Sequence, residues 1–505
     1  MKRRTFLRSS MAAAAAATLP FPQGRPRLFG LYRPPSGGSP DVPAVTGDGR
    51  EVTLRGGDLA DLAARIRGRI LLAQDDGYEE ARRILNPSFD RRPALIAQVT
   101  GAADVRAAVD FARDNGGLLT AVKCGGHSLS GKSTCDRGIM IDLSTFRGVH
   151  VDPIRRRARV AGGTLLGQVD HETMSHGLVT PMGTVSHTGA GGLVTGGGFG
   201  RLARRWGLSL DNVTAVDVVT ADGSFVRANQ EEHPDLFWGV RGGGGNFGVV
   251  TSFEFQLHPL ERRVLAGPIF YPMARAREVL TLYGDYAPVA PDGLQLDLIM
   301  VRPPAGGEAM AGFAVCYSGP AGQADGVLAP LRSLGTPMVD GIQGVDYVAL
   351  QRSGDTDDPR AQGTYTKSGF IEAMTPELMR ILVNTFQGHP QRATVLFAQH
   401  SGGAINRVLP DATAFPQRNV LANLLCFVDW PFGQDPTEHV RWIQAFWQGV
   451  EPHTQGFYVN DLEEAHSADD VGLNYQRNHQ RLVAVKNRYD PANLFRLNAN
   501  VIPTV

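Results

Sequence analysis

The stretch GTVSHTGAGGLVTGGGFG, residues 183–200, decides how this sequence is interpreted, because eight of its eighteen residues are glycine. Two other clusters flank it along the chain: VKCGGHSLSG at residues 122–131, and DLFWGVRGGGGNFGVVTSFEF at residues 235–255. Glycine permits positive φ angles and leaves backbone N–H groups uncovered, so such loops can line a concave anion site. One cluster could be an ordinary turn. Three together predict an extended ligand that is bound by the backbone of several loops.

The common nucleotide-binding fingerprints do not explain these clusters. A Rossmann site needs G-x-G-x-x-G between a strand and a helix, and residues 189–194 lack the third glycine. Residues 242–245 lead into a strand-like run instead of a helix, and no GK[ST] follows any cluster. A Rossmann fold and a P-loop are therefore both excluded by context.

Composition limits the class of protein further. With 505 residues the chain is expected to form two or more domains, and its 50 basic and 50 acidic residues give no electrostatic footprint for nucleic acid. Its four cysteines form no CxxC pair, so neither a zinc site nor any other metal site is predicted. One disulfide between Cys124 and Cys135 stays an alternative for an exported protein.

The first residues, MKRRTFLRSS, place Arg3 and Arg4 ahead of an alanine-rich stretch at residues 11–19. Paired arginines before a weakly apolar segment are typical of a twin-arginine signal peptide, which we expect at residues 1–22. The alternative is a helical tail with chance basic residues. The signal predicts a periplasmic or secreted protein, and no other apolar run approaches the ~20 residues of a membrane helix, so no membrane insertion is expected.

The pattern of glycine clusters and expected helices and strands changes twice along the chain. Residues 23–85 are expected to be a lead-in, and a strand–helix–strand pattern follows at residues 93–100, 102–116 and 118–123. The glycine clusters thin out from about residue 265, where strands are predicted at 294–301 and 312–318. A helix-like run at residues 474–489 marks the return to the pattern of the first part. The middle of the chain therefore reads as an insert between two parts of one domain.

Taken in order, the motifs xxGGHSxxG, GxGGxxxGGGxG, DLFWxxRGGGGNFGVVT and RLxxxKxxYDPxNLF resemble those of the FAD-linked oxidases of the vanillyl-alcohol-oxidase superfamily, in particular the berberine-bridge-enzyme-like branch. The resemblance covers residues 86–257 and 474–503. It implies an α+β fold in which a two-part, PCMH-type FAD-binding domain is made from both chain ends. Its domains are implied to be residues 86–262 and 456–505 for FAD, with an inserted substrate domain of antiparallel sheet plus helices at residues 263–455.

The resemblance also implies how FAD is held. His127 falls on the histidine that bonds covalently to the flavin 8α-methyl group, and Val185 replaces the cysteine that makes a second link in some relatives. A monocovalent FAD is therefore expected. The other implied cofactor contacts are Lys123, Cys124, Gly125, Gly126, Ser128, Leu129, Thr184, Gly189, Gly191, Gly192, Gly196, Gly197, Gly198, Gly248, Val249, Val250, Asn474, Tyr475 and Asn498.

Five residues carry the implied chemistry. Thr188 falls on the position that lines the oxygen pocket beside the flavin. Family members often carry a tyrosine base in a YxNY segment, which reads Tyr458-Val459-Asn460-Asp461 here. Asp461 could act as a base if burial raises its pKa, or be an exposed turn residue, and Tyr458 is then the better candidate for a phenol that faces the substrate. Lys367 and His400 are candidate substrate contacts, with surface or core roles as the alternatives.

The expected function is an exported oxidase. It would remove a hydride from an alcohol, sugar or amine C–H bond and reduce oxygen to hydrogen peroxide, so its partners are a small-molecule substrate and oxygen. A dehydrogenase that uses another electron acceptor is the first alternative, and a flavin- or ligand-binding protein without turnover is the second.

Overall fold

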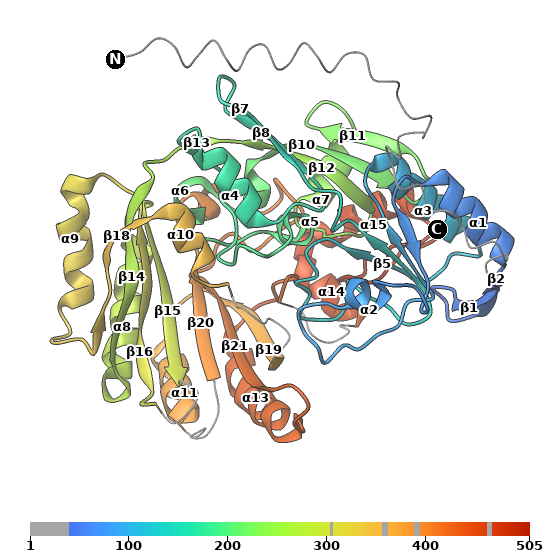
Figure 1. Cartoon of the computed structure of the whole chain (residues 1–505). Coiled ribbons are helices and arrows are strands. Elements are labelled where there is room, and N and C mark those ends of the chain that lie inside the picture. Colours follow the sequence, from blue (N-terminus) through green and yellow to red (C-terminus); the bar gives the residue numbers. More distant parts are fainter. Residues whose placement is uncertain (1–39, 303–306, 356–361, 388–393, 462–466) are drawn as a thin grey trace, which may run out of the picture.

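The computed structural model describes residues 40–302, 307–355, 362–387, 394–461 and 467–505. The predicted signal peptide lies outside these residues. Two parts lie side by side in Figure 1: several small sheets with the glycine-rich loops, and a large sheet backed by helices. The chain is of the α+β class, as the sequence predicts, because it combines helices with two larger sheets whose strands are all antiparallel.

The first sheet is built from the predicted strand–helix–strand unit. Its strand order is β3-β4-β6-β5, with β4 and β5 parallel to β6. The helix α3 (Ala102–Asp114) packs its buried side chains Val105, Val109 and Ala112 into the core beside this sheet. The strand bounds are β3 (Arg69–Leu71), β4 (Leu95–Gln98), β5 (Thr120–Lys123) and β6 (Ile139–Asp142).

The prediction of a lead-in up to residue 85 is wrong for its described part. β1 (Val42–Val45) and β2 (Glu51–Leu54) form a hairpin, α1 (Gly56–Arg65) packs against α3, and β3 pairs with β4. These strands have three or four residues each, too short to give a periodic signal in the sequence. The segment from Val42 to α2 (Tyr78–Arg82) therefore belongs to the first domain.

A second, antiparallel sheet of five strands follows, in the order β11-β10-β12-β8-β7. A buried core that includes Val216, Phe253 and Phe255 lies against it. Around this sheet lie the helices that carry the glycine loops. The bounds are β7 (Val149–Asp152), β8 (Arg157–Ala161), β10 (Val213–Thr220), β11 (Phe225–Asn229), β12 (Gly248–Gln256), α4 (Leu166–Met174), α5 (Ala190–Gly196), α6 (Ala203–Trp206) and α7 (Pro234–Val240).

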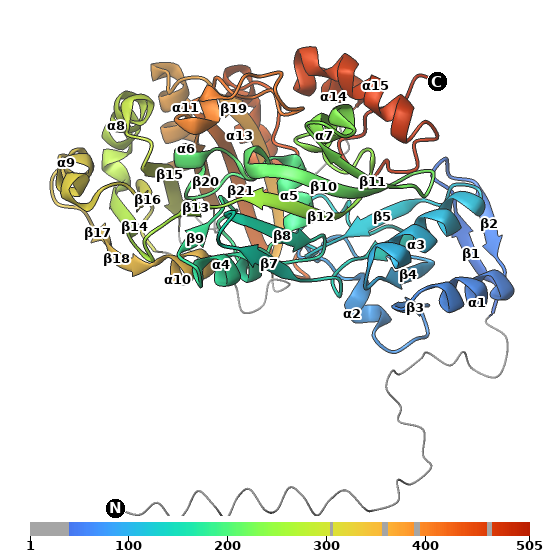
Figure 2. The ribbon, with the colours of Figure 1, turned by 90° about the horizontal axis from the view of Figure 1, so that it is seen from above.

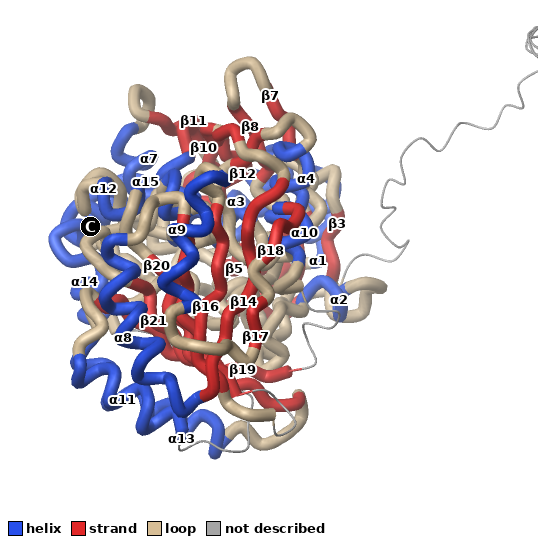
Figure 3. The backbone as a smooth tube through the Cα atoms, turned by 90° about the vertical axis from the view of Figure 1, so that its left-hand side faces the viewer, coloured by secondary structure: helices blue, strands red, loops and turns tan. Residues whose placement is uncertain are grey.

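The inserted part is one antiparallel sheet with the order β17-β14-β16-β15-β20-β21-β19, and β18 pairs with β14. Helices α8, α11 and α13 gather on one side of it (Figure 3) and bury a core of aliphatic and aromatic side chains. The bounds are β14 (Arg263–Pro272), β15 (Leu294–Arg302), β16 (Met310–Tyr317), β17 (Val339–Asp340), β18 (Gln343–Asp346), β19 (Gln362–Ile371), β20 (Thr394–His400), β21 (Ala422–Pro431), α8 (Ala276–Tyr286), α9 (Ala324–Leu328), α10 (Tyr347–Arg352), α11 (Pro376–Gln387), α12 (Ala404–Arg407) and α13 (Thr437–Val450). β9 (Leu178–Val179) and β13 (His258–Pro259) form a small separate pair.

After the insert the chain returns to the first part. Figure 2 shows α14 (Ala468–Tyr475) and α15 (His479–Tyr489) beside α7, and α15 packs against it. The predicted continuous helix at residues 474–489 is interrupted, because Gln476 takes a left-handed backbone angle of φ 50° between the two helices. In the described part of the chain, no helix is both long and apolar enough to cross a membrane.

Candidate active site

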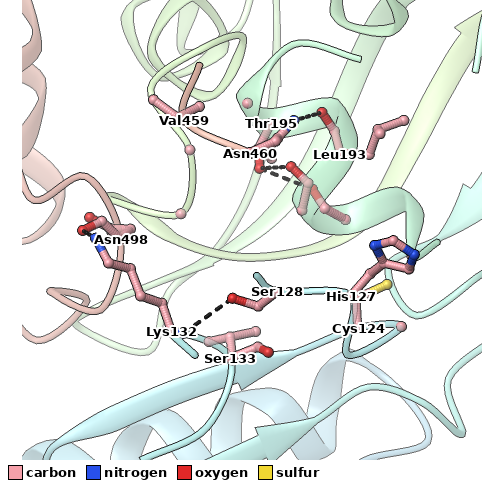
Figure 4. Close-up of a pocket in the computed structure, with 18 of the residues that line it drawn as sticks. Cys124, His127, Ser128, Lys132, Ser133, Leu193, Thr195, Val459, Asn460 and Asn498 are labelled. Carbon is pink, nitrogen blue, oxygen red and sulfur yellow. Dashed lines mark hydrogen bonds between the residues drawn. The ribbon is translucent and has the colours of Figure 1, made fainter. Parts of the chain in front are cut away.

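All three glycine clusters meet at one cleft of about 380 Å³. Figure 4 shows His127 and Lys132 on either side of Ser128, with Asn460 and Thr195 facing them across the cleft. The C-terminal part closes the cleft with residues 458–461 and 495, 497–499. The cleft brings together most of the predicted site residues: Cys124, Gly125, Gly126, His127, Ser128, Leu129, Thr184, Thr188, Gly189, Gly191, Gly192, Gly196, Gly248, Val249, Val250, Tyr458, Asp461, Tyr475 and Asn498.

Gly125 and Gly189 explain why two of the clusters must be glycine. A Cβ atom on Gly125 would lie 2.5 Å from the backbone nitrogen of Gly189, and one on Gly189 would lie 2.3 Å from the nitrogen of Gly125. Any side chain at either position would force the two loops apart. At Gly192, Gly244 and Gly245, in contrast, an added Cβ would meet nothing within 4 Å, so backbone is left open to the cleft.

Four predicted cofactor contacts lie beside the cleft and not on its described lining. The ammonium group of Lys123 donates to the carbonyl of Ala81 at 2.5 Å, behind the first glycine loop. Gly197 and Gly198 pack against Tyr458 and Ser209. The side-chain oxygen of Asn474 accepts a hydrogen bond from the backbone of Phe457 at 2.8 Å, so Asn474 supports the segment that reaches the cleft.

The two predicted substrate contacts are not brought to the described lining either. His400 is completely buried in the inserted domain, where its Nε2 lies 2.7 Å from a guanidinium nitrogen of Arg204. Burial and the neighbouring guanidinium both lower the pKa of His400 well below its usual value. Lys367, on β19, holds its ammonium group 5.7 Å from the ring centre of Tyr365. The position of His400 corrects the expectation of a substrate contact, because its ring lies between Arg204 and the carbonyl of Ala287 and not on the lining of the cleft.

His127 lies in the turn after β5 and lines the cleft. Burial, followed by the neighbouring His187, lowers the pKa of His127 to about 4, so the imidazole is neutral at physiological pH. The thiol of Cys124, in the same turn, donates to the carbonyl of Gly162 at 3.0 Å, and burial raises its pKa to about 11. The neutral imidazole is thus the available nucleophile in this loop, while the thiol stays protonated. All four cysteines are free, so the alternative of a Cys124–Cys135 bridge does not hold.

The loop at residues 183–188 is held from the inserted domain. Asp355 accepts hydrogen bonds from both the backbone nitrogen and the hydroxyl of Ser186, at 2.8 and 2.5 Å. The amide of Gln351 donates to the carbonyl of Gly183 at 2.9 Å. Val185 and Thr188 line the cleft on this loop, and the Thr188 hydroxyl has no partner among the described residues. The inserted domain therefore fixes the loop on which the predicted oxygen pocket depends.

Tyr458 and Asp461 lie on the same turn but have different environments. The hydroxyl oxygen of Tyr458 accepts hydrogen bonds from the backbone of Gly198 at 2.7 Å and from the side chain of Asn460 at 2.8 Å. Its ring is surrounded by Phe199, Phe370 and Phe415. Tyr458 thus supports the glycine loop from beneath. Burial raises the pKa of Tyr458 far above its usual range, which excludes it as a base near neutral pH.

Asp461 has the character of a base. Burial raises the pKa of its carboxyl group to about 6, opposed by one hydrogen bond from the side chain of Asn423 at 2.9 Å. A carboxylate with such a pKa can accept a proton near neutral pH. The sequence alternative of an exposed turn residue is not what the structure shows, because Asp461 lines the cleft.

Sequence reasoning missed Lys132, which lines the cleft with its ammonium group 2.8 Å from the carbonyl oxygen of Asn498. Burial, and then the nearby Arg91, lowers the pKa of Lys132 to about 8. The position, five residues after His127 in a loop expected to line an anion site, was the available signal. At pH 7 this lysine brings a positive charge into the cleft.

A second missed feature ties the C-terminal part to the third glycine cluster. The fully buried ammonium group of Lys486 donates to the carboxylate of Asp490 at 2.7 Å, to the carbonyl of Asn246 at 2.8 Å and to that of Phe495 at 2.9 Å. The side chain of Asn246 in turn bonds the backbone of Ala499 and Val501. Every donor of the lysine is satisfied, and these bonds fix the segment of residues 495–499 at the cleft.

The residues present fit an FAD. Open backbone at Gly192, Gly244 and Gly245 can approach a pyrophosphate, and Lys132 can neutralise part of its charge. The Ser133 hydroxyl and the Asn498 side-chain oxygen line the cleft, are buried, and have no partner among the described residues. Buried polar atoms require partners, and a ligand with many polar atoms would supply them. The described residues hold no cluster of three side chains suited to a metal ion.

A cleft that is built from three glycine loops and closed by the C-terminal part, with an antiparallel sheet inserted between these two parts of the chain, defines an FAD-dependent oxidoreductase. The family model "FAD binding domain" matches residues 93–229, and "Berberine and berberine like" matches residues 461–502. The chain therefore belongs to the berberine-bridge-enzyme-like family of FAD-linked oxidoreductases, and its similarity to known members spans most of its length.

Among the relatives, an FAD-linked oxidoreductase of Dictyostelium discoideum is 32% identical over 433 residues, which cover 85% of this chain and 93% of the relative. The (R)-6-hydroxynicotine oxidase of Paenarthrobacter nicotinovorans is 30% identical over 455 residues, or 87% of this chain and 97% of the relative. The crystal structure of 6-hydroxy-D-nicotine oxidase from Arthrobacter nicotinovorans superposes with a TM-score of 0.78 at 28% identity, covering 87% of this chain and 98% of the other. A chitooligosaccharide oxidase, at 24% identity with a TM-score of 0.80 and coverage of 89% and 100%, shares the fold.

Proposed function

We propose that the protein is an exported FAD-dependent oxidase with a flavin that is bound covalently through His127 alone. It takes a hydride from a substrate carbon that bears oxygen or nitrogen, and it passes the electrons to oxygen to form hydrogen peroxide. The observation that carries the proposal is the presence of a neutral His127 and a proton-accepting Asp461 in one glycine-lined cleft.

FAD, when bound, supplies the hydride acceptor, and the protein supplies binding, orientation and proton transfer. Asp461 takes the proton that the substrate loses when the hydride leaves, since its raised pKa matches that task near neutral pH. Phe199, Tyr458 and the aromatic rings behind them form an apolar floor that excludes water from the reacting groups. Lys132 adds positive charge at the far side of Ser128 from His127.

The single covalent link rests on His127 and on the absence of a second nucleophile at Val185. The link would join an imidazole nitrogen of His127 to the flavin methyl carbon. One C–H and one N–H hydrogen would be lost, which amounts to two protons and an electron pair, and oxygen would finally accept the pair. We expect acid-precipitated, digested protein to keep its yellow fluorescence on one peptide that contains His127, with a mass increase matching FAD or a fragment of it.

The His127→Ala variant is the matched test of the link. The glycine loops and Lys132 should still bind FAD, but denaturation should release it. Free flavin from acid-treated unmutated protein would disprove the covalent bond and leave the FAD fold intact. A second modified peptide would show that the loop around Val185 contributes a link after all.

Oxidase and dehydrogenase activity are separated by comparing oxygen consumption with dye reduction on the same substrate. We expect oxygen to be consumed with formation of hydrogen peroxide at a rate similar to that of substrate-driven flavin bleaching. The small side chain at Thr188 favours this outcome, because it leaves room beside the flavin position. Rapid dye reduction without oxygen consumption would assign the protein as a dehydrogenase.

Export rests on Arg3 and Arg4 ahead of the alanine-rich stretch. Replacing both arginines by lysine should leave the protein in the cytoplasm, because the twin-arginine route depends on that pair. Cell fractionation followed by immunoblotting measures the result. Unchanged export of the variant would contradict the proposal for this route.

A further inference from the structure

One polar row crosses from the inserted domain to the C-terminal part of the chain. Gln399 on β20 and Asn423 on β21 are paired neighbours in the sheet, and Asp461 follows the YxN segment. The side-chain nitrogen of Asn423 lies 2.8 Å from Gln399 Oε1 and 2.9 Å from Asp461 Oδ2. Gln399 and Asp461 line the cleft, while Asn423 is completely buried behind them.

The ionised carboxylate of Asp461 determines the orientation of every group in this row. A carboxylate only accepts hydrogen bonds, so Asn423 must present its NH₂ group. The second hydrogen of that NH₂ group then goes to the oxygen of Gln399, which turns the Gln399 NH₂ group away from Asn423. Asn423 Oδ1 is left buried without a partner among the described residues, a penalty that the opposite orientation would avoid only by leaving Asp461 unbonded.

Two hydrogen-bonding groups therefore remain for a ligand. Gln399 Nε2 is a donor and Asp461 Oδ1 is an acceptor, and neither has a partner among the described residues. Because their side chains share one nitrogen atom as a hydrogen-bond partner, the donor and the acceptor lie at the same end of the cleft.

We infer that this row binds the reacting hydroxyl group of a neutral alcohol substrate such as a sugar, with Gln399 donating to the hydroxyl oxygen and Asp461 accepting its hydrogen. The inference rests on the proposed function and names its substrate class. In the reaction, the O–H proton passes to Asp461 and the hydride leaves the same carbon for the flavin, so the C–O single bond becomes C=O. Asn423 is a positioning residue that aligns both partners.

An amine fits the same row less well. A hydroxyl group offers both a donor and an acceptor, whereas an ammonium group offers only donors. An ammonium group could donate a hydrogen bond to Asp461, but it offers no acceptor for the N–H groups of Gln399. These N–H groups would lose the water that they bind when the ammonium group displaces it. The row therefore discriminates between two substrate classes of similar size.

The test compares benzyl alcohol with benzylamine, two probes of nearly equal size, and adds cellobiose as a sugar. Each is titrated anaerobically into the flavin-loaded protein, and its dissociation constant is read from the perturbation of the visible flavin spectrum. Hydroxyl probes should bind more tightly than benzylamine. Gln399→Glu, which replaces the donor by an acceptor, should weaken hydroxyl binding about tenfold and strengthen benzylamine binding.

Gln399→Met removes the donor without adding charge and should weaken hydroxyl binding alone, which keeps the test valid if Gln399→Glu does not fold. Gln444→Glu on the exposed face of α13 makes the same chemical change away from the cleft and should alter nothing. Tighter binding of benzylamine than of the hydroxyl probes to the unmutated protein would overturn the inference. So would unchanged hydroxyl binding in both Gln399 variants, or the failure of every hydroxyl probe to perturb the spectrum up to its solubility limit. Binding without flavin reduction would count against the oxidase function alone.

Discussion

The imidazole rings of His127 and His187 lie with their centres 5.0 Å apart and their planes tilted by 35°. Two histidines at this distance resist simultaneous protonation, and burial adds the larger effect, so the pKa of His127 falls to about 4. His187 Nε2 is buried without a partner among the described residues. The pair therefore keeps the proposed attachment nucleophile uncharged over the whole physiological range.

This relationship predicts the pH dependence of flavin attachment. Apoprotein incubated with FAD should reach the same rate of acid-stable flavin formation at pH 6 as at pH 8, because His127 is neutral at both. A histidine with the ordinary pKa near 6.5 would be only about one quarter neutral at pH 6. Acid-stable fluorescence over time measures the rate, and a severalfold decrease at pH 6 would contradict the lowered pKa.

Thr188 predicts the reaction with oxygen. If the size of this side chain governs the access of oxygen, the reduced flavin of Thr188→Val should be reoxidised as fast as that of the unmutated protein, because valine keeps the volume and removes only the unpartnered hydroxyl. Thr188→Ile has a larger side chain, and its reduced flavin should react with oxygen much more slowly. Substrate reduction of the flavin should change little in either variant. Stopped-flow mixing of reduced protein with oxygen is the measurement, and equal rates in all three proteins would exclude Thr188 as the gate.

Asp461 predicts the pH profile of catalysis. Its pKa of about 6 means that the carboxyl group is protonated, and cannot accept a proton, at lower pH. The value of kcat/KM should therefore rise with pH up to about 6 and level off above it. Asp461→Asn should slow anaerobic flavin reduction by about 10²–10⁴-fold at pH 8 and abolish this limb. Asp429→Asn on β21, a carboxylate bonded by Thr364 outside the cleft, is the control. A profile that breaks near pH 4 would contradict the assignment.

Lys132 predicts how FAD affinity depends on pH. In the His127→Ala background, where FAD binds without a covalent link, affinity should decrease about tenfold from pH 7 to pH 9 as Lys132 loses its charge. Lys132→Met should bind weakly at both values, and Lys367→Met on β19 should behave like the background protein. Quenching of FAD fluorescence gives the dissociation constants. An unchanged affinity in Lys132→Met would show that the ammonium group does not contact FAD.

The hydrogen bonds of Lys486 predict that replacing this residue lowers the free energy of unfolding. Lys486→Met removes the cationic partner of the buried Asp490 carboxylate, which keeps only the backbone N–H groups of Leu494 and Phe495 as donors among the described residues. This loss should cost about 3–5 kcal/mol of unfolding free energy. Urea denaturation followed by tryptophan fluorescence measures the change, with Lys367→Met, at a half-buried lysine outside this network, as the control. A difference below about 1 kcal/mol between the two variants would mean that water replaces the lost bonds.

Patterns of local sequence predicted part of this structure. Residue periodicity, which is a local signal, predicted the strand–helix–strand unit around α3 and the strands β15 and β16. The glycine content of three short segments predicted that their loops bind one ligand. The polar row of Gln399, Asn423 and Asp461 could not be predicted in the same way. Its members come from two strands and a turn of different parts of the chain, and their hydrogen bonds exist only after the sheet has formed. The contact between His400 and Arg204 could not be predicted for the same reason, since the two residues lie far apart in the sequence.

The bonds of Lys486 have a consequence for biosynthesis. Asn246 emerges from the ribosome well before Lys486, with the whole inserted sheet translated between them, yet the two residues must meet before residues 495–499 can close the cleft. The nascent chain can therefore fold its inserted sheet while its first part still lacks a lid over the ligand position. Closure of the cleft over the ligand position must therefore wait until residues 486–499 have been synthesised.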